Sequence, residues 1–262
     1  MGQNPLGAAL CMTTLAGLST GLGGLLVLWL KPTRRLLSRA LGFAAGVMLA
    51  VSLADLLPGS LHAFEGSLPG AAAGALAAGL LLAGMLLAAL MSALLPDEGR
   101  VLADAAESEP SRARALHCGL AVGLALLFHN LPEGILTLFS GIQDPRAGLR
   151  LSLAIALHNL PEGISTAAPL WYATRSRWKS AAAAFASGLA EPVGALLAYF
   201  VLEPVLTEPM LQGMTLGAAG IMCWVSVAEL LFGGFEMGQK FDTAAGFAVG
   251  VCGMTLGIAI LS

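Results

Sequence analysis

The hexapeptide HNLPEG occurs twice in this chain of 262 residues, at 129–134 and again at 158–163, inside strongly apolar sequence. If each copy is helical, its histidine and glutamate lie four residues apart on one face, and its asparagine shares that face. Imidazole, carboxylate and amide oxygen are ligands that suit borderline divalent ions such as Zn²⁺, Fe²⁺ and Mn²⁺. The sequence therefore predicts two sets of metal ligands: His129, Asn130 and Glu133 in the first copy, and His158, Asn159 and Glu162 in the second.

Each copy also contains one proline and ends in one glycine. Pro132 and Pro161 lack a backbone N–H and clash with the preceding helical turn, so we expect both helices to kink beside the polar cluster. Gly134 and Gly163 have no side chain, which permits close approach of a neighbouring backbone.

The composition is that of a membrane protein. Hydrophobic residues make up 57% of the chain and charged residues 11%, with a mean hydropathy of +0.82, whereas a soluble domain carries about 25% charged residues. Spanning segments in lipid must satisfy their backbone groups internally, which favours helices. We therefore expect an all-α polytopic membrane protein, a single transmembrane domain over 1–262. The net charge of −3 argues against a nucleic-acid partner.

Apolar runs of about 20 residues predict eight spanning helices. Their expected ranges are 6–30, 36–58, 70–95, 115–141, 148–170, 180–202, 209–231 and 243–261. The mixed-charge segment 96–114 is predicted to be a flexible cytoplasmic loop.

The distribution of lysine and arginine predicts the orientation of the chain. With the N-terminus outside, eleven of these residues fall in cytoplasmic loops, and only Arg146 and Arg150 fall in outer loops. We therefore expect both termini outside. Compact loops and the lack of a targeting sequence favour the inner membrane of a bacterium.

A second, more diverged repeat joins the two ends of the chain. The segment 46–60, GVMLAVSLADLLPGS, aligns without gaps on 220–234, GIMCWVSVAELLFGG, and Asp55 falls on Glu229. The same offset also lays 180–202 over 6–28. The aligned spans run in opposite directions in the predicted topology, and so do the two HNLPEG spans. Inverted repeats around a midplane site are typical of secondary transporters, here in a 3+2+3 arrangement.

Acidic residues within or near the predicted spans need a counter-charge. Each costs about 2.5–3.5 kcal/mol at the centre of a helix in lipid, and no lysine or arginine lies deep in a predicted span to pair with them. A bound cation is therefore their natural partner. Glu191, followed by Pro192, adds a ligand from the sixth span, whereas Asp55 and Glu229, near span ends, are predicted to lie at the two mouths of a cation pathway.

These residues resemble the ZIP (Zrt-, Irt-like protein) family of metal transporters. The resemblance rests on the two HNLPEG motifs, the Glu191–Pro192 pair and the eight-span layout, and it covers essentially the whole chain. It implies passage of Zn²⁺ and related ions toward the cytoplasm, through a site between the second, fourth, fifth and sixth spans.

The resemblance also implies roles for individual residues. His129, Glu133, His158 and Glu162 correspond to the principal site, and Asn130, Asn159 and Glu191 to an adjacent second site that shares both HNLPEG glutamates. Two metals bridged by these glutamates would use all the ligands. Met48 is the candidate for a methionine that the second span contributes in some members. The family's histidine-rich loop is missing, because 96–114 contains no histidine.

We therefore expect an alternating-access transporter of divalent transition-metal ions, Zn²⁺ foremost and Fe²⁺, Mn²⁺ and Cd²⁺ besides. Its partners would be these ions and the lipid bilayer, with a homodimer as an option and no prosthetic group. A metal-selective channel with the same ligands is one alternative. A haem-binding membrane protein with His129 and His158 as axial ligands is another. An enzyme of the intramembrane metalloprotease class is disfavoured because the chain lacks HExxH.

Overall fold

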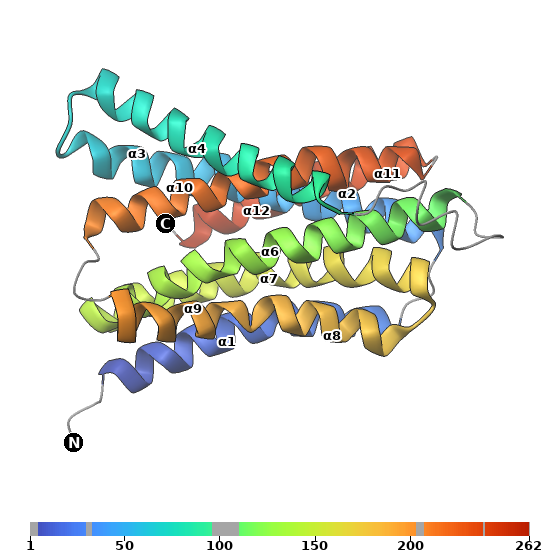
Figure 1. Ribbon diagram of the computed structural model, residues 1–262, viewed down its shortest axis with the longest axis horizontal. Coiled ribbons are helices and arrows are strands. Elements are labelled where there is room, and N and C mark those ends of the chain that lie inside the picture. Colours follow the sequence, from blue (N-terminus) through green and yellow to red (C-terminus); the bar gives the residue numbers. More distant parts are fainter. Residues whose placement is uncertain (1–4, 30–32, 96–109, 203–206, 238, 262) are drawn as a thin grey trace.

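The computed structural model describes residues 5–29, 33–95, 110–202, 207–237 and 239–261. Within these ranges all regular elements are helices and no strand occurs, which confirms the predicted all-α fold. The helices form an elongated bundle, with the start of α1 and the end of α12 toward the same end of it (Figure 1).

The long helices correspond closely to the predicted spans. In chain order they are α1 (Pro5–Leu26), α2 (Arg34–Val51), α3 (Leu57–Glu65), α4 (Gly70–Ala93), α6 (Pro110–Gln143), α7 (Pro145–Thr174), α8 (Arg177–Gly188), α9 (Ala190–Leu197), α10 (Glu208–Trp224), α11 (Phe232–Glu236) and α12 (Lys240–Leu261). Short π-helical segments join α2 to α3 (Ser52–Leu56) and α10 to α11 (Val225–Leu231), and another, Ala198–Leu202, extends α9. Each of these three stretches is therefore one continuous helical segment.

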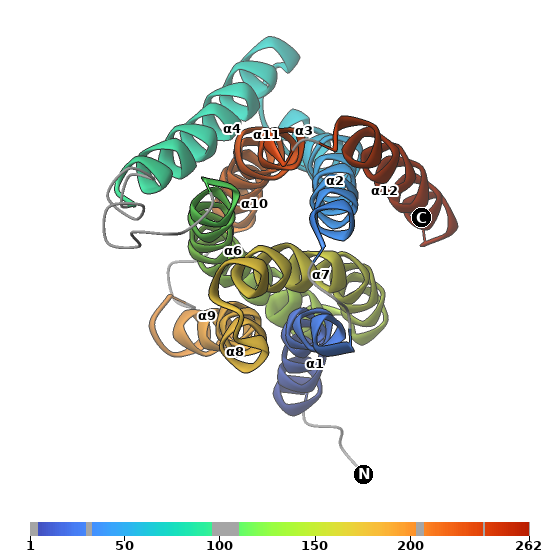
Figure 2. The ribbon, with the colours of Figure 1, turned by 90° about the vertical axis from the view of Figure 1, so that its right-hand side faces the viewer.

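Seven helical segments of the described chain are long and apolar enough to cross a membrane, and the protein is a multi-pass membrane protein. Helix α7 is not among the seven, although its 30 residues reach about 45 Å at 1.5 Å per residue. It lies inside the bundle, between α1 and α8 on one side and α2 on the other (Figure 2). The count of eight spans, with both termini outside, stays a prediction.

Two sequence-based boundaries need correction. Residues 110–114 belong to α6, so this part of the predicted loop 96–114 is wrong, and the remainder lies outside the described residues. Arg146 and Arg150 lie in the first turns of α7, not in a loop.

The packing of the helices follows the predicted inverted repeat. Helix α1 packs on α7 as α9 packs on α6, and α2 packs on α12 as α10 packs on α4. The π-helical segments begin at or next to two serines that the repeat makes equivalent: Ser52 Oγ donates to Met48 O at 2.9 Å and Ser226 Oγ to Met222 O at 2.7 Å. These paired contacts support the inverted repeat.

The first and sixth spans, however, align differently from the sequence-based offset of 174. The carbonyl of Ala16 accepts a hydrogen bond from Asn159 and that of Ser187 accepts one from Asn130, so the equivalent residues are 171 positions apart. Gly17 and Gly188, which are equivalent in the same register, pack against each other. The offset of 174 is wrong for this pair by about one helical turn, because runs of small apolar residues match in several registers and packing selects one.

The HNLPEG glycines are contact points between helices, as predicted. A Cβ atom at Gly134 would overlap the carbonyl oxygen of Glu191 on α9, and one at Gly163 would overlap that of Thr20 on α1. Both motif helices are therefore held against their neighbours, backbone to backbone.

We expect Gly163→Val to destabilise the protein, because the added side chain must push α1 away from α7. Overpacking of this kind costs about 1–3 kcal/mol or more, which lowers the apparent Tm by roughly 5 °C. Thermal unfolding in detergent would measure this. Gly74→Val is the control, since no atom lies within 4 Å of a Cβ there, and equal Tm values for the two variants would contradict the packing role.

Candidate metal centre

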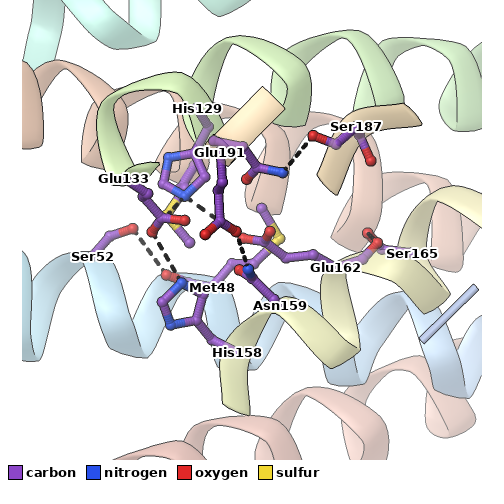
Figure 3. A network of polar contacts seen from close by, with 12 residues as sticks. Met48, Ser52, His129, Glu133, His158, Asn159, Glu162, Ser165, Ser187 and Glu191 are labelled. Carbon is purple, nitrogen blue, oxygen red and sulfur yellow. Dashed lines mark hydrogen bonds and ion pairs between the residues drawn. The ribbon is translucent and has the colours of Figure 1, made fainter. Parts of the chain in front are cut away.

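The polar residues expected to bind metal lie close together where α6, α7 and α9 meet, and Figure 3 labels all of them except Asn130. Helix α6 contributes His129, Asn130 and Glu133, α7 contributes His158, Asn159 and Glu162, and α9 contributes Glu191. None of these residues is more than 3% exposed. Three helices thus bring both motifs and the third glutamate into one buried cluster.

One carboxylate oxygen lies at the centre of the nitrogen-containing half of the cluster. Glu133 Oε1 is 3.0 Å from His129 Nε2 and 3.0 Å from His158 Nε2. Ligand atoms of these three residues all lie within 4.8 Å of one another. Ligands on a tetrahedral ion with bonds of about 2.0 Å are separated by about 3.3 Å, so this spacing is compatible with one shared divalent ion. Glu162 Oε1 lies 3.7 Å from His129 Nε2.

The other half of the cluster presents mainly oxygen atoms. The Nδ2 atom of Asn159 donates to Glu191 Oε1 and, at 3.0 Å, to Ala16 O on α1. Asn130 Nδ2 donates to Ser187 O on α8 at 2.9 Å. Both amide nitrogens are therefore held by neighbouring groups, and both amide oxygens have no hydrogen-bond partner within the described chain.

Several carboxylate oxygens in the cluster also have no hydrogen-bond partner among the described residues. These are Glu133 Oε2, Glu191 Oε2 and both oxygens of Glu162. Burying such groups without a partner is costly, and it is relieved by a positive charge. The donor set therefore suits a divalent cation.

Met48 is fully buried in α2, and Figure 3 draws it beside the cluster of α6 and α7 residues. A thioether is a soft ligand, compatible with late transition metals. Its role as a ligand stays a prediction.

A cavity of about 210 Å³ reaches the cluster from one side. Its lining includes Asp55 together with His129, Glu133 and His158. On α7 the lining runs from His158 back to Arg150, near the α6–α7 turn, so the cavity extends toward the end of the bundle where α1 begins. Asp55 lines this cavity, and its role at a pathway mouth stays a prediction.

The second predicted mouth residue, Glu229, is in a different situation. It is only 5% exposed, does not line this cavity, and its Oε2 has no partner among the described residues. Its backbone carbonyl accepts a hydrogen bond from Cys118 Sγ at 3.4 Å. Of the two acids that the repeat makes equivalent, Asp55 is exposed and Glu229 is buried.

Two residues at this centre were not recognised from the sequence. Arg150 lines the access cavity two turns before His158 on α7, so an arginine does line the cavity that reaches Glu133. Thr20 occupies on α1 the place that Glu191 holds on α9, and its buried hydroxyl has no partner within the described residues. Arg150 could have been found from its spacing of eight residues from His158, whereas Thr20 required the corrected repeat alignment.

The kinks expected at Pro132 and Pro161 stay predictions. Helix α6 continues through Pro132 and α7 through Pro161, each without a break in the helix.

The fold and the buried cluster define a polytopic membrane protein with a centre suited to divalent metal ions. Comparison with known proteins agrees. A sequence profile described as ZIP zinc transporter matches residues 97–261, and the chain belongs to this family.

Curated relatives match along nearly the whole chain. One named zinc transporter ZupT, from Chlorobium phaeovibrioides, is 40% identical, covering 99% of this chain and all of the relative. Proteins of the same name from Corynebacterium efficiens and Streptococcus mutans are 37% and 34% identical, each covering 95% of this chain and 96% of the relative.

Proposed function

We propose that this protein carries Zn²⁺ and similar divalent transition-metal ions across the bacterial plasma membrane into the cytoplasm. The observation that carries the proposal is the convergence of His129, His158 and Glu133 in a buried centre that a cavity reaches from one end. Family membership supports divalent metal transport, and zinc is named for the relatives.

Within this proposal, the cluster holds the ion as it crosses. His129, Glu133, His158 and Glu162 form the principal site, and Met48 can join it from α2. Asn130, Asn159 and Glu191 supply oxygens for a second ion, with Glu133 and Glu162 shared between the two. The unpartnered oxygens of both amides and of Glu191 support this second position. Ion binding competes with protonation of the same ligands, so release is favoured by protons.

Alternating access is supported by the unequal surroundings of the two repeats. Leu151 and Ala154 line the cavity and are partly exposed, whereas their counterparts before the first HNLPEG motif, Val122 and Ala125, are buried in the core. In an inverted-repeat transporter, exchanging the arrangements of the two repeats produces the state open to the other side. The buried set is then the lining of the second access route, with Glu229 at its mouth.

The charges at the two ends of the bundle support inward transport. Arg146 and Arg150 lie near the start of α7, at the end where the cavity extends. Most of the other described lysines and arginines lie in the first turns of α2, α6, α8 and α12, at the opposite end. Because cytoplasmic ends are rich in these residues, the cavity faces outward.

We expect purified protein in proteoliposomes to take up Zn²⁺ with saturation, and the double variant Glu133→Ala, Glu162→Ala to lose uptake. Removing a metal's outer-shell partners already costs 10–100-fold in affinity or activity, so loss of two direct ligands is expected to exceed about 100-fold. Initial uptake rates over a range of Zn²⁺ concentrations measure this.

The double variant Glu65→Ala, Glu208→Ala is the matched control, because both glutamates are exposed and lie outside the cluster. Absence of uptake by folded wild type, across several divalent ions, would overturn the proposed function. A rate that rises linearly without saturation would favour a channel with the same ligands.

The second access route gives a separate prediction. In a background without the four native cysteines, Ala154→Cys should react with a membrane-impermeant thiol reagent from the cavity side. Ala125→Cys should react only from the opposite side, and more slowly, because its site is packed in this state. Labelling from each side of oriented vesicles measures this, and reaction of both cysteines from the same side would contradict exchange of the repeats.

A further inference from the structure

The cavity that leads to the metal centre contains a positive charge. Arg150 lines it together with Asp55, Glu133 and both histidines of the cluster. On α7 the lining residues Arg150, Ala154 and His158 follow one another at intervals of four, so the arginine stands on the same helix face as a predicted ligand.

No structural contact explains this arginine. Its side chain is exposed, and it makes no hydrogen bond or ion pair within the part of the chain that the structure describes. Arg35 and Arg39, by comparison, are both bound to Asp242, at 3.0 and 2.7 Å. The repeat does not require it either, since its counterpart before the first HNLPEG motif, on α6, is the buried Ala121.

A guanidinium group in this position repels every arriving cation, whatever its identity. The ions differ in the bonds that they form once they reach the cluster. Zn²⁺ gains bonds to two imidazoles in addition to carboxylates, whereas Mg²⁺ and Ca²⁺ prefer oxygen ligands and gain little from imidazole. The same repulsion is therefore offset for transition metals and not for the hard cations.

We propose that Arg150 sets an affinity threshold in the outer access cavity: its charge weakens the binding of every divalent cation by the same factor, so that Zn²⁺, held by imidazole and carboxylate together, still binds the metal centre at concentrations at which Mg²⁺ and Ca²⁺ do not. This rests on the proposed transport function and adds a residue outside the ligand set. Asp55, across the same cavity, has the opposite effect and raises the local concentration of all cations.

The test is Zn²⁺ uptake into proteoliposomes by Arg150→Gln, with and without Ca²⁺ as competitor. The KM for Zn²⁺ should fall about three- to tenfold at low ionic strength, and Ca²⁺ should inhibit the variant at concentrations that leave wild type unaffected. Raising monovalent salt from about 0.01 M to about 0.15 M shortens the screening length from about 30 Å to about 8 Å, so the difference in KM should shrink.

Three further variants separate charge from structure. Arg150→Lys keeps the charge and should restore the wild-type KM. Asp55→Asn should raise the KM, with the larger loss of uptake at low Zn²⁺. Arg146→Gln removes a positive charge one turn away that does not line the cavity, and should lower the KM less than Arg150→Gln does.

The outcomes distinguish this proposal from the proposed function. If wild type takes up Zn²⁺ with saturation but Arg150→Gln has the same KM and the same response to Ca²⁺, the threshold role of Arg150 is overturned and transport stands. A KM shift that does not respond to salt, or that Arg150→Lys shares, would also overturn it. Failure of wild type to take up any divalent ion would remove the proposed function itself.

Discussion

Three glutamates and two histidines buried in the middle of a membrane-spanning bundle impose the constraint on which this structure depends. Carboxylates in such surroundings need a positive partner, yet neither oxygen of Glu162 has a hydrogen-bond partner among the described residues, and its Oε1 lies 3.7 Å from His129 Nε2. The chain places no lysine against them in the part that the structure describes. A centre of this kind is stable in combination with a mobile cation, which is the property that a transporter of cations requires.

That centre is assembled by close backbone packing. Gly134 contacts α9 at Glu191, and Gly163 contacts α1 at Thr20, so each motif helix is fixed directly beside its polar residues. The side-chain amides of Asn130 and Asn159 are also held by the backbone of neighbouring helices, through hydrogen bonds to the carbonyls of Ser187 and Ala16. All predicted ligands except Met48 therefore belong to one group of helices, α1 and α6 to α9, and the cavity lies where this group meets α2, α10 and α12.

Much of this arrangement could be predicted from the sequence, because the strongest signals are local. Apolar length located the helices to within a few residues at most ends, and helical spacing placed the ligands of each motif on one face. The π-helical segments at Ser52 and Ser226 were not foreseen, since no local residue pattern requires them. The register of the first span against the sixth was also missed, because it is decided by contacts such as Gly17 with Gly188 and not by matching letters. Helix α7 carries polar motif residues and is not among the segments apolar enough to be recognised as spans. Its position inside the bundle follows from its contacts with neighbouring helices.

The two halves of the inverted repeat share a backbone design but differ in side chains. Leu56 lines the cavity while its equivalent, Leu230, is fully buried, and the same contrast holds for Asp55 and Glu229. These pairs have similar chemistry, so exchanging the two repeats would open a route of similar character at the opposite end. Arg150 and Ala121 break the pattern, since a charge lines the cavity at one position and a buried methyl group occupies the equivalent position. In the proposed transport cycle the inverted repeat provides a second route, and the unmatched side chains are where the ion affinity of the two routes can differ.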